Sequence, residues 1–501
     1  MSKNIVRLQA HDGSPVEFVN EVKGSGGLKD CYFAPDRSYV VLFFRDPVDS
    51  NGRDRLRSIV GRYRDGIFSQ AGGDYWARVY CWPERTVEWG DKFGIVAPVY
   101  AKHFFFQYGS KNQDMLKIAG REKEGKWFAS ANNRAKFLDP RELGSWATHL
   151  RVCLLISRAV RRMHMAGLAH SDLSYKNVLV DPAGGNACII DIDGLVVPGK
   201  FAPDVVGTPD FIAPEVVATA CLGKHDPNRE LPSVLTDQHA LAVLIYLYLL
   251  YRHPLRGGKV HDQDSTRDEE LSMGERALFV EDPNDASNRI KLAQARPSDL
   301  PWADTTLRPY TLTGPYLAPL FLKAFTEGLK NPMARPSATE WETALIRTVD
   351  LLQPCLNKSC EQGWYVFDNS SKPRCPFCGT PFKGKLPVLN LYYSTHKAGQ
   401  FRPENHRLMV YTDQSLFPWH VQRGIAPNEK LTDHQRQRVG YFVFHNHKWY
   451  LVNERLPELF NASTQQGVPV GEKVELTEDL KLLLSRAEGG RLIHVQLVDA
   501  S

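Results

Sequence analysis

Short apolar runs separated by turn-forming residues dominate the first hundred positions of the chain, a pattern that predicts a sheet. We expect strands over residues 16–23, 30–33, 38–44, 76–82, 87–89 and 94–100. Between the third and fourth of these strands, apolar side chains recur at helical spacing from Leu56 to Tyr63, which predicts a helix over residues 54–63. This region is therefore expected to form a small sheet with one helix.

Longer helical segments follow residue 140. Apolar side chains with helical spacing begin at Trp146 and end near Gly167, a suitable C-terminal cap. Further helices are expected over residues 240–251, 317–329 and 337–352. The polar segments 108–140 and 257–310 lack this periodicity. We interpret the first as an irregular insertion or solvated helix, and the second as an insertion long enough to carry a short helix or a partner site.

The last part of the chain has the alternation that is typical of strands. A hairpin is predicted by the alternating runs 441–444 and 449–452. Residues 474–476 and 491–495 predict further strands. We therefore expect a β-rich domain over residues 385–501.

Composition limits the class of protein. A chain of 501 residues is expected to hold roughly two to four domains, and 43% hydrophobic residues are enough for ordinary cores. The formal charge of +5 is small for this length and does not indicate a nucleic-acid partner. Residues 1–13 lack the apolar core of a signal peptide, and the longest apolar stretch, 240–251, is too short to span a bilayer. We expect a cytoplasmic protein without a membrane partner.

Oxygen-bearing side chains gather around one predicted hairpin. Two apolar runs, 178–180 and 188–190, flank a turn and predict this hairpin. Asp172 and Asn177 precede it and Asp191 follows it, so all three side chains are expected at one end. Three such groups suit phosphoryl transfer: one positions and deprotonates an attacking hydroxyl, and two hold Mg²⁺ against triphosphate oxygens.

This arrangement resembles the catalytic loop and the D-F-G segment of protein kinases. Later segments resemble the same family in the same order. Gly207 to Glu215 is similar to the end of an activation segment, with the A-P-E sequence intact. Asp237, at the start of the long apolar helix, is similar to the start of the family's buried central helix. Arg335 matches the Arg that pairs with the A-P-E Glu.

The resemblance implies an α+β, two-lobed, protein-kinase-like fold, with a small lobe over residues 1–100 and a large lobe over residues 101–352. It also implies ATP and Mg²⁺ as cofactors. The reaction would transfer the γ-phosphate to a Ser or Thr hydroxyl of a partner protein or of the chain itself.

Within this resemblance, three residues would have catalytic roles. Asp172 would orient the substrate hydroxyl, and Asn177 and Asp191 would hold Mg²⁺. Asp193 stays open as a second ligand. We prefer Asp191, because it directly follows the apolar strand and lies fourteen positions after Asn177, nearer to the family's spacing.

Five further residues would have structural or substrate roles. His170 would tie the catalytic loop to its neighbours, and Asp237 would accept hydrogen bonds from the backbone of that loop. Thr208 would line the substrate site. Glu215 and Arg335 would form a structural ion pair.

Two cations compete for the role of the phosphate-binding Lys. A glycine-rich turn with Gly24, Gly26 and Gly27 lies where kinases cover the phosphates, and glycines let backbone N–H groups approach them. The third strand ends in Arg45 where the family usually has Lys. Gly24 to Lys29 resembles the with-no-lysine kinases, whose phosphate-binding Lys comes from the second strand. Either Lys29 or Arg45 is therefore expected to contact the phosphates.

The chain also departs from the family. The helix over residues 54–63 lacks the Glu that usually pairs with the phosphate Lys, and Asp65 is the nearest substitute. Ser174 replaces the Lys that usually follows the catalytic Asp. These differences leave open a pseudokinase scaffold that only binds partners. A small-molecule kinase shares the catalytic core, but such enzymes usually lack an A-P-E segment like residues 213–215.

Four cysteines form two pairs after the kinase-like region. Cys355 and Cys360 are followed, after fourteen residues, by Cys375 and Cys378 in a C-P-x-C-G sequence. Two such pairs suit a tetrahedral, structural Zn²⁺ site, so we expect a zinc ribbon over residues 353–384. A redox C-x-x-C is the alternative, but it would leave the first pair unexplained.

The domain order carries one further resemblance. Residues 385–501 faintly resemble forkhead-associated β-sandwiches, although the phosphopeptide-reading residues of that family are not recognisable. Kinase, zinc ribbon and β-rich end together resemble bacterial eukaryotic-type kinases of tellurite-resistance-type gene clusters. That resemblance implies a von Willebrand factor A-type protein as a partner and a metal-dependent phosphatase as an antagonist, besides the protein substrate.

Overall fold

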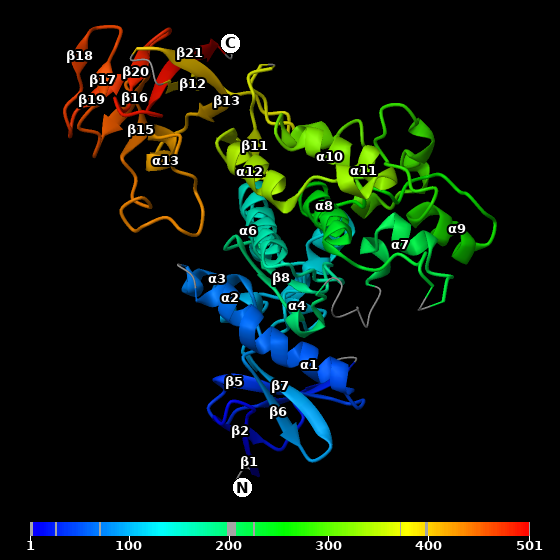
Figure 1. Cartoon of the computed structure of the whole chain (residues 1–501). Helices are drawn as coiled ribbons and strands as arrows, with labels where there is room; N and C mark the ends of the chain where they lie inside the picture. The colour runs from blue at the N-terminus through cyan, green and yellow to red at the C-terminus, as the bar shows by residue number, and fades with distance from the viewer. Residues whose placement is uncertain are drawn as a thin grey trace. The chain divides into compact units, whose positions relative to one another are not determined.

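The computed structural model of the chain (Figure 1) describes residues 4–25, 28–69, 72–197, 207–223, 226–370, 372–395 and 399–499. The chain divides into two compact units. The first contains Met1–Gly144, Thr148–Tyr310 and Leu320–Glu342, and the second contains Ser145–Ala147, Thr311–Pro319 and Thr343–Ser501.

A five-stranded antiparallel sheet begins the first unit, in the order β3-β4-β5-β7-β6. Its strands are β3 (Gly24–Ser25), β4 (Lys29–Phe33), β5 (Tyr39–Phe44), β6 (Arg85–Trp89) and β7 (Lys92–Pro98). These strands confirm four of the six predicted ones. A separate hairpin of β1 (Ile5–Gln9) and β2 (Pro15–Val19) supplies Phe18 to an aromatic cluster with Phe43 and Trp89.

The helix predicted over residues 54–63 is present but irregular. It consists of α1 (Ser50–Ser58), the π-helix η1 (Ile59–Tyr63) and α2 (Arg64–Phe68). Within η1, Gly61 has non-helical backbone angles of φ −95° and ψ −110°. A π-helical turn at a glycine interrupts the regular hydrogen-bond ladder and is a recognised cause of bending.

The prediction of a strand over residues 76–82 is wrong. Its first part belongs to α3 (Gly73–Val79), a helix. Trp76, Val79 and Tyr80 are all buried. Trp76 and Val79, three positions apart, lie on one face of this helix, and burying that face outweighs the local preference of aromatic residues for strands. Tyr80 follows the helix with extended backbone.

Two long helices and a short hairpin follow. The helices are α6 (Trp146–Met165) and α8 (Val234–Leu250), and the hairpin pairs β8 (Val178–Asp181) with β9 (Asn186–Ile189). Nearly every side chain of α8 from Thr236 onward is buried, in agreement with the uncharged apolar sequence from Ala240 to Leu250. Shorter helices are α7 (Pro214–Ala218), α10 (Ala318–Phe325), α11 (Glu327–Lys330) and α12 (Ala338–Val349).

Both polar insertions are folded. The first contains α4 (Lys111–Asp114) and α5 (Ala131–Lys136), and the second contains α9 (Ser265–Met273) followed by short 3₁₀ turns. The hydroxyl of Ser298 in the second insertion donates a hydrogen bond of 2.6 Å to Oδ1 of Asn132 in the first. The two insertions therefore contact each other.

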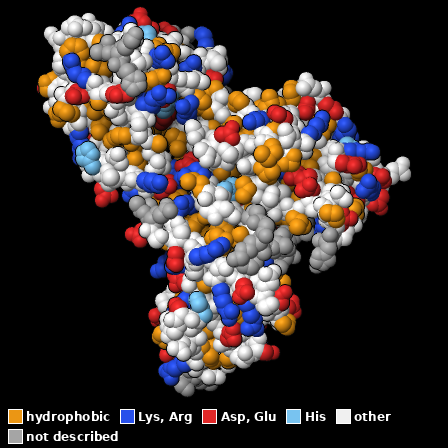
Figure 2. Space-filling view, viewed as in Figure 1, with side chains coloured by type: hydrophobic (Ala, Val, Ile, Leu, Met, Phe, Trp, Pro, Cys, Tyr) orange, Lys and Arg blue, Asp and Glu red, His pale blue; other side chains and the backbone are white. Residues whose placement is uncertain are grey.

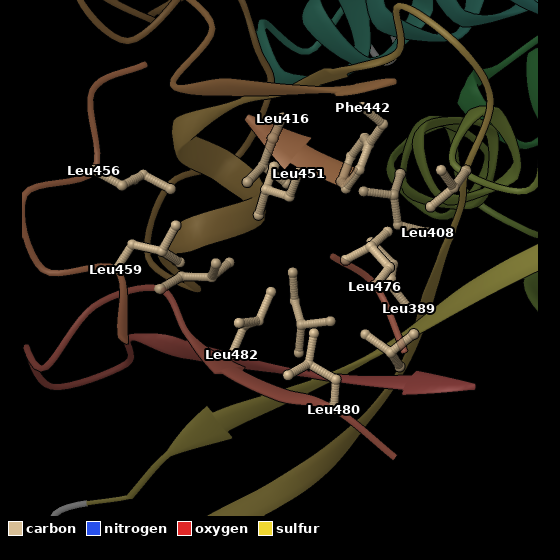
Figure 3. Close-up of a cluster of buried hydrophobic side chains, with 14 of the residues drawn as sticks. Leu389, Leu408, Leu416, Phe442, Leu451, Leu456, Leu459, Leu476, Leu480 and Leu482 are labelled. Carbon is tan, nitrogen blue, oxygen red and sulfur yellow. The ribbon is translucent and has the colours of Figure 1, made fainter. Parts of the chain in front are cut away.

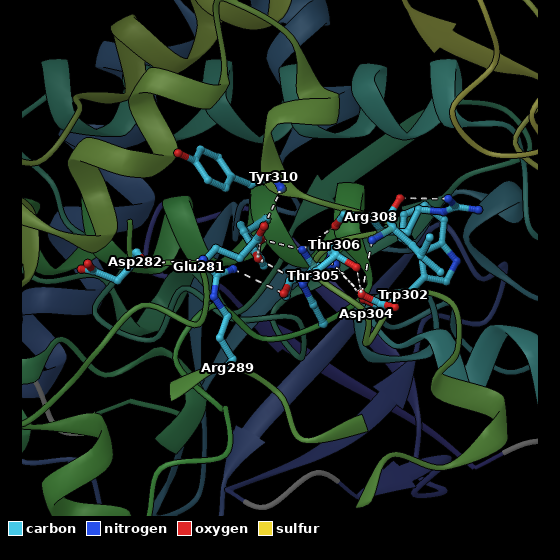
Figure 4. A network of polar contacts seen from close by, with 12 residues as sticks. Glu281, Asp282, Arg289, Trp302, Asp304, Thr305, Thr306, Arg308 and Tyr310 are labelled. Carbon is cyan, nitrogen blue, oxygen red and sulfur yellow. Dashed lines mark hydrogen bonds and ion pairs between the residues drawn. The ribbon is translucent and has the colours of Figure 1, made fainter. Parts of the chain in front are cut away.

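Buried Glu281 organises the second insertion (Figure 4). Its carboxylate accepts hydrogen bonds from the guanidinium of Arg252 and, at 2.9 Å, from the backbone N–H of Tyr310. Asp304 orders the next turn by accepting from the backbone N–H and the hydroxyl of Thr306, at 2.8 and 2.7 Å. A buried carboxylate requires such donors, so these contacts fix the course of a segment that has little regular structure.

The second unit ends in two antiparallel sheets that enclose one core. One sheet has the strand order β13-β12-β21-β20-β17-β18 and the other has the order β14-β15-β16-β19. The bounds are β12 (Lys385–Ser394), β13 (Phe401–Met409), β14 (Ser415–Leu416), β15 (Gly440–His445), β16 (Lys448–Asn453), β17 (Phe460–Asn461), β18 (Gln466–Gly467), β19 (Lys473–Glu475), β20 (Lys481–Leu483) and β21 (Arg491–Asp499). Buried side chains from both sheets, among them Leu389, Leu451 and Leu482, fill the space between them (Figure 3).

Charged side chains of both signs are interspersed with apolar ones over the face drawn in Figure 2. The apolar helix α8 has 17 residues and packs inside the first unit. Among the described residues, no helix combines the length and the apolar character that a membrane span requires.

Candidate active site

One buried carboxylate holds the loop that follows α6. Asp237, in the first turn of α8, is 1% exposed and accepts hydrogen bonds from the backbone N–H groups of His170 (2.7 Å) and Ser171 (3.1 Å). Nε2 of His164 lies 3.1 Å from the same carboxylate. Ser171 has a φ of +67°, an uncommon conformation that these bonds stabilise. The loop is thereby fixed to the central helix.

Both oxygens of the Asp172 carboxylate have partners. Oδ1 accepts from the backbone N–H and the hydroxyl of Thr208, at 2.7 and 2.8 Å, and Oδ2 accepts from Nδ2 of Asn177 at 2.9 Å. The hydroxyl of Thr208 also lies 3.2 Å from Oγ of Ser174, which is buried. The structure thus brings Asp172, Asn177 and Thr208 together, and their contacts set the orientation of the carboxylate.

The hairpin places Asp191 next to the loop that contains Asp172 and Asn177. The backbone N–H of Ile190 donates to the carbonyl of Asn177 at 3.0 Å, and Nε2 of His170 lies 2.9 Å from the carbonyl of Ile190. Asp191 follows in the left-handed conformation, with φ +59°, just before the 3₁₀ turn Ile192–Gly194. Residues other than glycine rarely adopt this conformation, and such backbone strain is concentrated at functional sites.

Lys29 of β4 reaches the same end of the hairpin. Its Nζ is 3.0 Å from Oδ1 of Asp191 and 2.6 Å from Oδ2 of Asp193. The side chains of Lys29 and Asp193 are 15% and 9% exposed, whereas that of Asp191 is 47% exposed. The three groups therefore form a partly buried cluster with one accessible carboxylate.

The charges in this cluster stabilise one another. Burial lowers the pKa of Lys29, but the carboxylates of Asp193 and Asp191 outweigh burial and raise this pKa above its usual range. Burial raises the pKa of Asp191, but Lys29 outweighs it and holds this pKa below its usual value. Lys29 is therefore an ammonium and Asp191 a carboxylate at neutral pH.

Arg45 lies on the other face of the sheet. Its Nε donates to Oδ1 of Asp30 at 2.9 Å, and its side chain is 40% exposed. Successive side chains of a strand point to opposite faces, so Asp30 and its partner Arg45 lie away from Lys29. Of the two cations that the sequence left open, the structure brings Lys29 to Asp191. Gly24 is in β3 beside this strand, and Gly26 and Gly27 lie outside the described residues.

The carboxylates that pair with Lys29 are not the one that the sequence suggested. Asp65 is exposed in the first turn of α2, and Lys29 pairs with Asp191 and Asp193 instead. From the sequence, Asp193 is expected only as a second metal ligand. The sequence contained one indication of this pairing, because Asp193 lies two positions after Asp191 and helix α1 contains no Glu that could pair with Lys29.

A partly buried ion pair anchors the segment that follows Thr208. Nη1 and Nη2 of Arg335 donate to the two carboxylate oxygens of Glu215 at 2.8 and 2.7 Å. Arg335 is 4% exposed and also donates to the carbonyl of Leu235 at 2.9 Å. The bidentate geometry joins α7 to the start of α8.

A second anchor was not predicted from the sequence. Asp210 accepts from the hydroxyl of Tyr175 at 3.0 Å and from Nε of Arg256 at 2.7 Å, and no spacing rule marks these residues as partners. A cavity of about 710 Å³ opens beside Asp210 and Tyr175, and both insertions line it, with Trp127 and Arg296 among the residues. Through its contact with Tyr175, Asp210 ties the end of the segment after Thr208 to the loop that contains Asp172.

The four paired cysteines converge in the second unit, around the hairpin of β10 (Leu352–Pro354) and β11 (Trp364–Val366). Their Sγ atoms all lie within 4.8 Å of one another, with 3.4 Å between Cys355 and Cys378 and 3.9 Å between Cys360 and Cys375. A tetrahedral Zn²⁺ with Zn–S bonds of about 2.3 Å requires sulfur atoms about 3.8 Å apart. The cluster therefore has the dimensions of a Cys₄ metal site. Cys375 is fully buried and packs in one cluster with Leu386.

The region that contains Asp172, Asn177 and Asp191 is similar to protein kinases. Residues 123–342 match the model of the protein kinase domain family. The death-associated protein kinase dapk-1 of Caenorhabditis elegans is 35% identical over 102 residues, which are 20% of this chain and 6% of that protein. A dual serine/threonine and tyrosine protein kinase of Apis mellifera is 28% identical over 109 residues, which are 22% of this chain and 10% of that protein.

The matched segments thus span only 6% and 10% of the lengths of these curated relatives. Among solved structures, a rhoptry antigen kinase domain of Toxoplasma gondii is similar at 16% identity and a TM-score of 0.39, over 69% of this chain and 86% of that chain. Residues 123–342 are therefore similar to the protein kinase domain family, and parts of the chain are similar to serine/threonine protein kinases.

Replacing Asp237 with Ala would remove the acceptor of two backbone N–H groups. Each group left unpaired costs about 1–3 kcal/mol. We expect Asp237→Ala to lower the free energy of unfolding by about 2–4 kcal/mol and to raise hydrogen exchange in the peptide that contains His170 and Ser171. Glu230→Ala, at an exposed position before α8, is the matched control. Exchange that stays at the control level would show that Asp237 does not anchor the loop.

Proposed function

We propose that this chain is an ATP- and Mg²⁺-dependent protein kinase that transfers the γ-phosphate to a Ser or Thr hydroxyl of a partner protein or of itself. The observation that carries the proposal is the meeting of Asp172, Asn177 and Asp191 at one end of the β8–β9 hairpin, with Lys29 beside them. The match of residues 123–342 to the protein kinase domain supports it.

Asp172 supplies the acceptor for the proton of the attacking hydroxyl. Its carboxylate is held from two sides by Thr208 and Asn177, so its orientation is set before a substrate arrives. Phosphoryl transfer depends mainly on positioning and on stabilisation of charge, and a pre-oriented carboxylate serves the first of these.

Asn177 and Asp191 offer the oxygen atoms that suit Mg²⁺. Nδ2 of Asn177 donates to Asp172, which leaves the amide oxygen available as a ligand. The carboxylate of Asp191 is accessible, with 47% of its side chain exposed. Mg²⁺ bound with ATP would neutralise charge on the phosphates during transfer. Lys29 would contribute a second positive charge directed at the same phosphates.

The segment after Thr208 favours a protein as the substrate. Thr208 contacts the Asp172 carboxylate directly, and the pair of Glu215 and Arg335 holds the following residues in place. An ordered platform next to the acceptor for the hydroxyl proton suits an extended polypeptide better than a small molecule.

A catalytically weak pseudokinase scaffold is the second candidate. Ser174 occupies the position where protein kinases usually have a Lys that contacts the γ-phosphate, and its hydroxyl lies near Thr208. Loss of that positive charge would slow transfer without preventing the binding of nucleotide. A measurement of transfer, and not of binding, separates the two candidates.

The proposal includes a structural Zn²⁺ site at Cys355, Cys360, Cys375 and Cys378. Four thiolates with these separations complete a tetrahedral shell and leave no position open for catalysis. Buried Cys375 packs in the cluster that contains Leu386 of β12. Zinc would therefore stabilise the zinc ribbon and the adjoining strand β12 of the β-sandwich together.

The domain order supports a narrower assignment. A protein kinase domain, a Cys₄ cluster and a β-sandwich suit a cytoplasmic bacterial eukaryotic-type kinase of a tellurite-resistance-type gene cluster. Its protein substrate would then be a von Willebrand factor A-type protein, and a metal-dependent phosphatase would oppose it. The sandwich of residues 385–499, as a forkhead-associated-like domain, would bind protein partners, with no part for nucleic acid or membrane.

Asp172→Asn tests the proposed function. The amide cannot accept the proton of the hydroxyl, so we expect transfer of labelled γ-phosphate to fall about 10²-fold or more, while the affinity for ATP stays unchanged. Asp54→Asn, at a side chain that is 68% exposed, is the control and should keep full activity. Near-wild-type transfer by the Asp172 variant would reject the catalytic assignment.

The zinc site predicts about one zinc per chain by elemental analysis of protein purified without chelators. We expect Cys375→Ser to lose the metal and to raise hydrogen exchange in residues 352–386, while residues 146–250 keep their protection. Cys221→Ser, at an exposed cysteine outside the cluster, is the matched control. Protein that contains no zinc and has the same melting curve with and without added zinc would refute the site.

A further inference from the structure

We infer that Asp193 is the positioning residue for Lys29, the role that a Glu of the regulatory helix has in protein kinases. This inference rests on the proposed function, because the position of Lys29 matters only if the chain binds ATP. It replaces the expectation that Asp193 is a second Mg²⁺ ligand.

Asp193 is better placed than Asp191 to hold Lys29 permanently. Its Oδ2 lies 2.6 Å from Nζ of Lys29, compared with 3.0 Å for Oδ1 of Asp191. The side chain of Asp193 is only 9% exposed, and a buried carboxylate is stable only beside a cation or several donors. Without Lys29, Asp193 would be a buried charge with too little compensation. Asp191 is accessible and can exchange its partner for water or a metal ion.

The regulatory helix offers Lys29 no carboxylate. Within residues 50–69, all of which the structure describes, the acidic residues are Asp54 and Asp65. Asp54 is 68% exposed and lies 3.7 Å from Arg57, and Asp65 is exposed in α2. The non-helical backbone at Gly61 separates these two residues within the segment. The carboxylates that pair with Lys29 therefore come from Asp191 and Asp193, which follow the β8–β9 hairpin, and not from the regulatory helix.

The two aspartates near Lys29 can have different roles, Asp191 in metal binding and Asp193 in positioning Lys29. The 3₁₀ turn Ile192–Gly194 places both carboxylates against one ammonium group while it leaves only Asp191 accessible. If Mg²⁺ takes Asp191, Asp193 still holds Lys29 and keeps its charge directed at the phosphates. In kinases whose Lys depends on a helix Glu, the position of that helix controls activity. Here both partners of Lys29 lie on the metal-site segment, so the pair does not depend on movement of α1 and α2.

A double-mutant cycle on the binding of Mg·ATP tests this inference in the full-length chain. The four proteins are wild type, Asp193→Asn, Lys29→Met and the double variant, each titrated calorimetrically. We expect Asp193→Asn to weaken binding about tenfold. In the Lys29→Met background the same substitution should weaken binding no further, because its effect acts through Lys29.

Two more variants separate lost positioning from lost folding. Asp193→Glu keeps the carboxylate and should recover most of the affinity, whereas a general packing defect would not be repaired by a longer side chain. Asp65→Asn, on the helix, is the matched control and should bind Mg·ATP like wild type. Weaker binding of Mg·ATP by this control would indicate that the carboxylate that positions Lys29 lies on the helix, and would overturn the inference.

The remaining outcomes are also decisive. Wild-type affinity in Asp193→Asn would overturn the inference. So would a loss that adds fully to that of Lys29→Met, because Asp193 would then act on the metal or nucleotide directly. A wild-type chain that fails to bind Mg·ATP at all would overturn the proposed function too, which distinguishes that failure from failure of the Asp193 assignment alone.

Discussion

A buried ammonium group requires negative charge beside it, and this requirement joins the small sheet of the first unit to the hairpin that ends at Asp191. Lys29 and Asp193 are 164 positions apart in the chain, yet their charged atoms lie 2.6 Å apart. The contact forms only if β4 keeps its register with β5, which sets Lys29 opposite Phe44. A shift of one residue would turn the Lys29 side chain to the other face of the sheet. The arrangement of sheet, hairpin and 3₁₀ turn is therefore coupled to one ion-pair cluster.

A second buried charge, that of Asp237, fixes the loop that follows α6. It accepts from the backbone at His170 and Ser171 and has little contact with solvent, so the loop that contains Asp172 has one favoured position. The two anchors differ in character, because the cluster around Lys29 includes an accessible carboxylate and the one around Asp237 does not. This difference suits the proposed chemistry. The acceptor for the hydroxyl proton must stay in place, whereas the metal and the nucleotide must enter and leave.

Much of the site could be predicted from the sequence, because its elements are defined by neighbouring residues. Two apolar runs marked the β8–β9 hairpin, an uncharged stretch marked α8, and the spacing from Asp172 to Asn177 marked the loop. The spacing of Asp191 and Asp193 marked a second carboxylate, but its pairing with Lys29 depends on a contact across 164 positions, which local patterns do not reveal. The choice between Lys29 and Arg45 likewise depended on which face of the sheet each side chain occupies. Residues 76–82 were mispredicted because burial of Trp76 and Val79 on one helix face outweighed the local preference of this aromatic segment for a strand.

Asn177 and Asp191 are the proposed metal ligands on which the assignment of function depends. A crystal structure of the full-length chain with Mn²⁺ and a non-hydrolysable ATP analogue tests them most directly, because anomalous scattering locates the metal independently of the protein atoms. We predict Mn²⁺ between the amide oxygen of Asn177 and the carboxylate of Asp191. Lys29 should contact the phosphates while its Nζ stays within hydrogen-bond distance of Asp193. A metal held by Asp193 in place of Asp191, or a nucleotide that does not contact Lys29, would contradict this assignment.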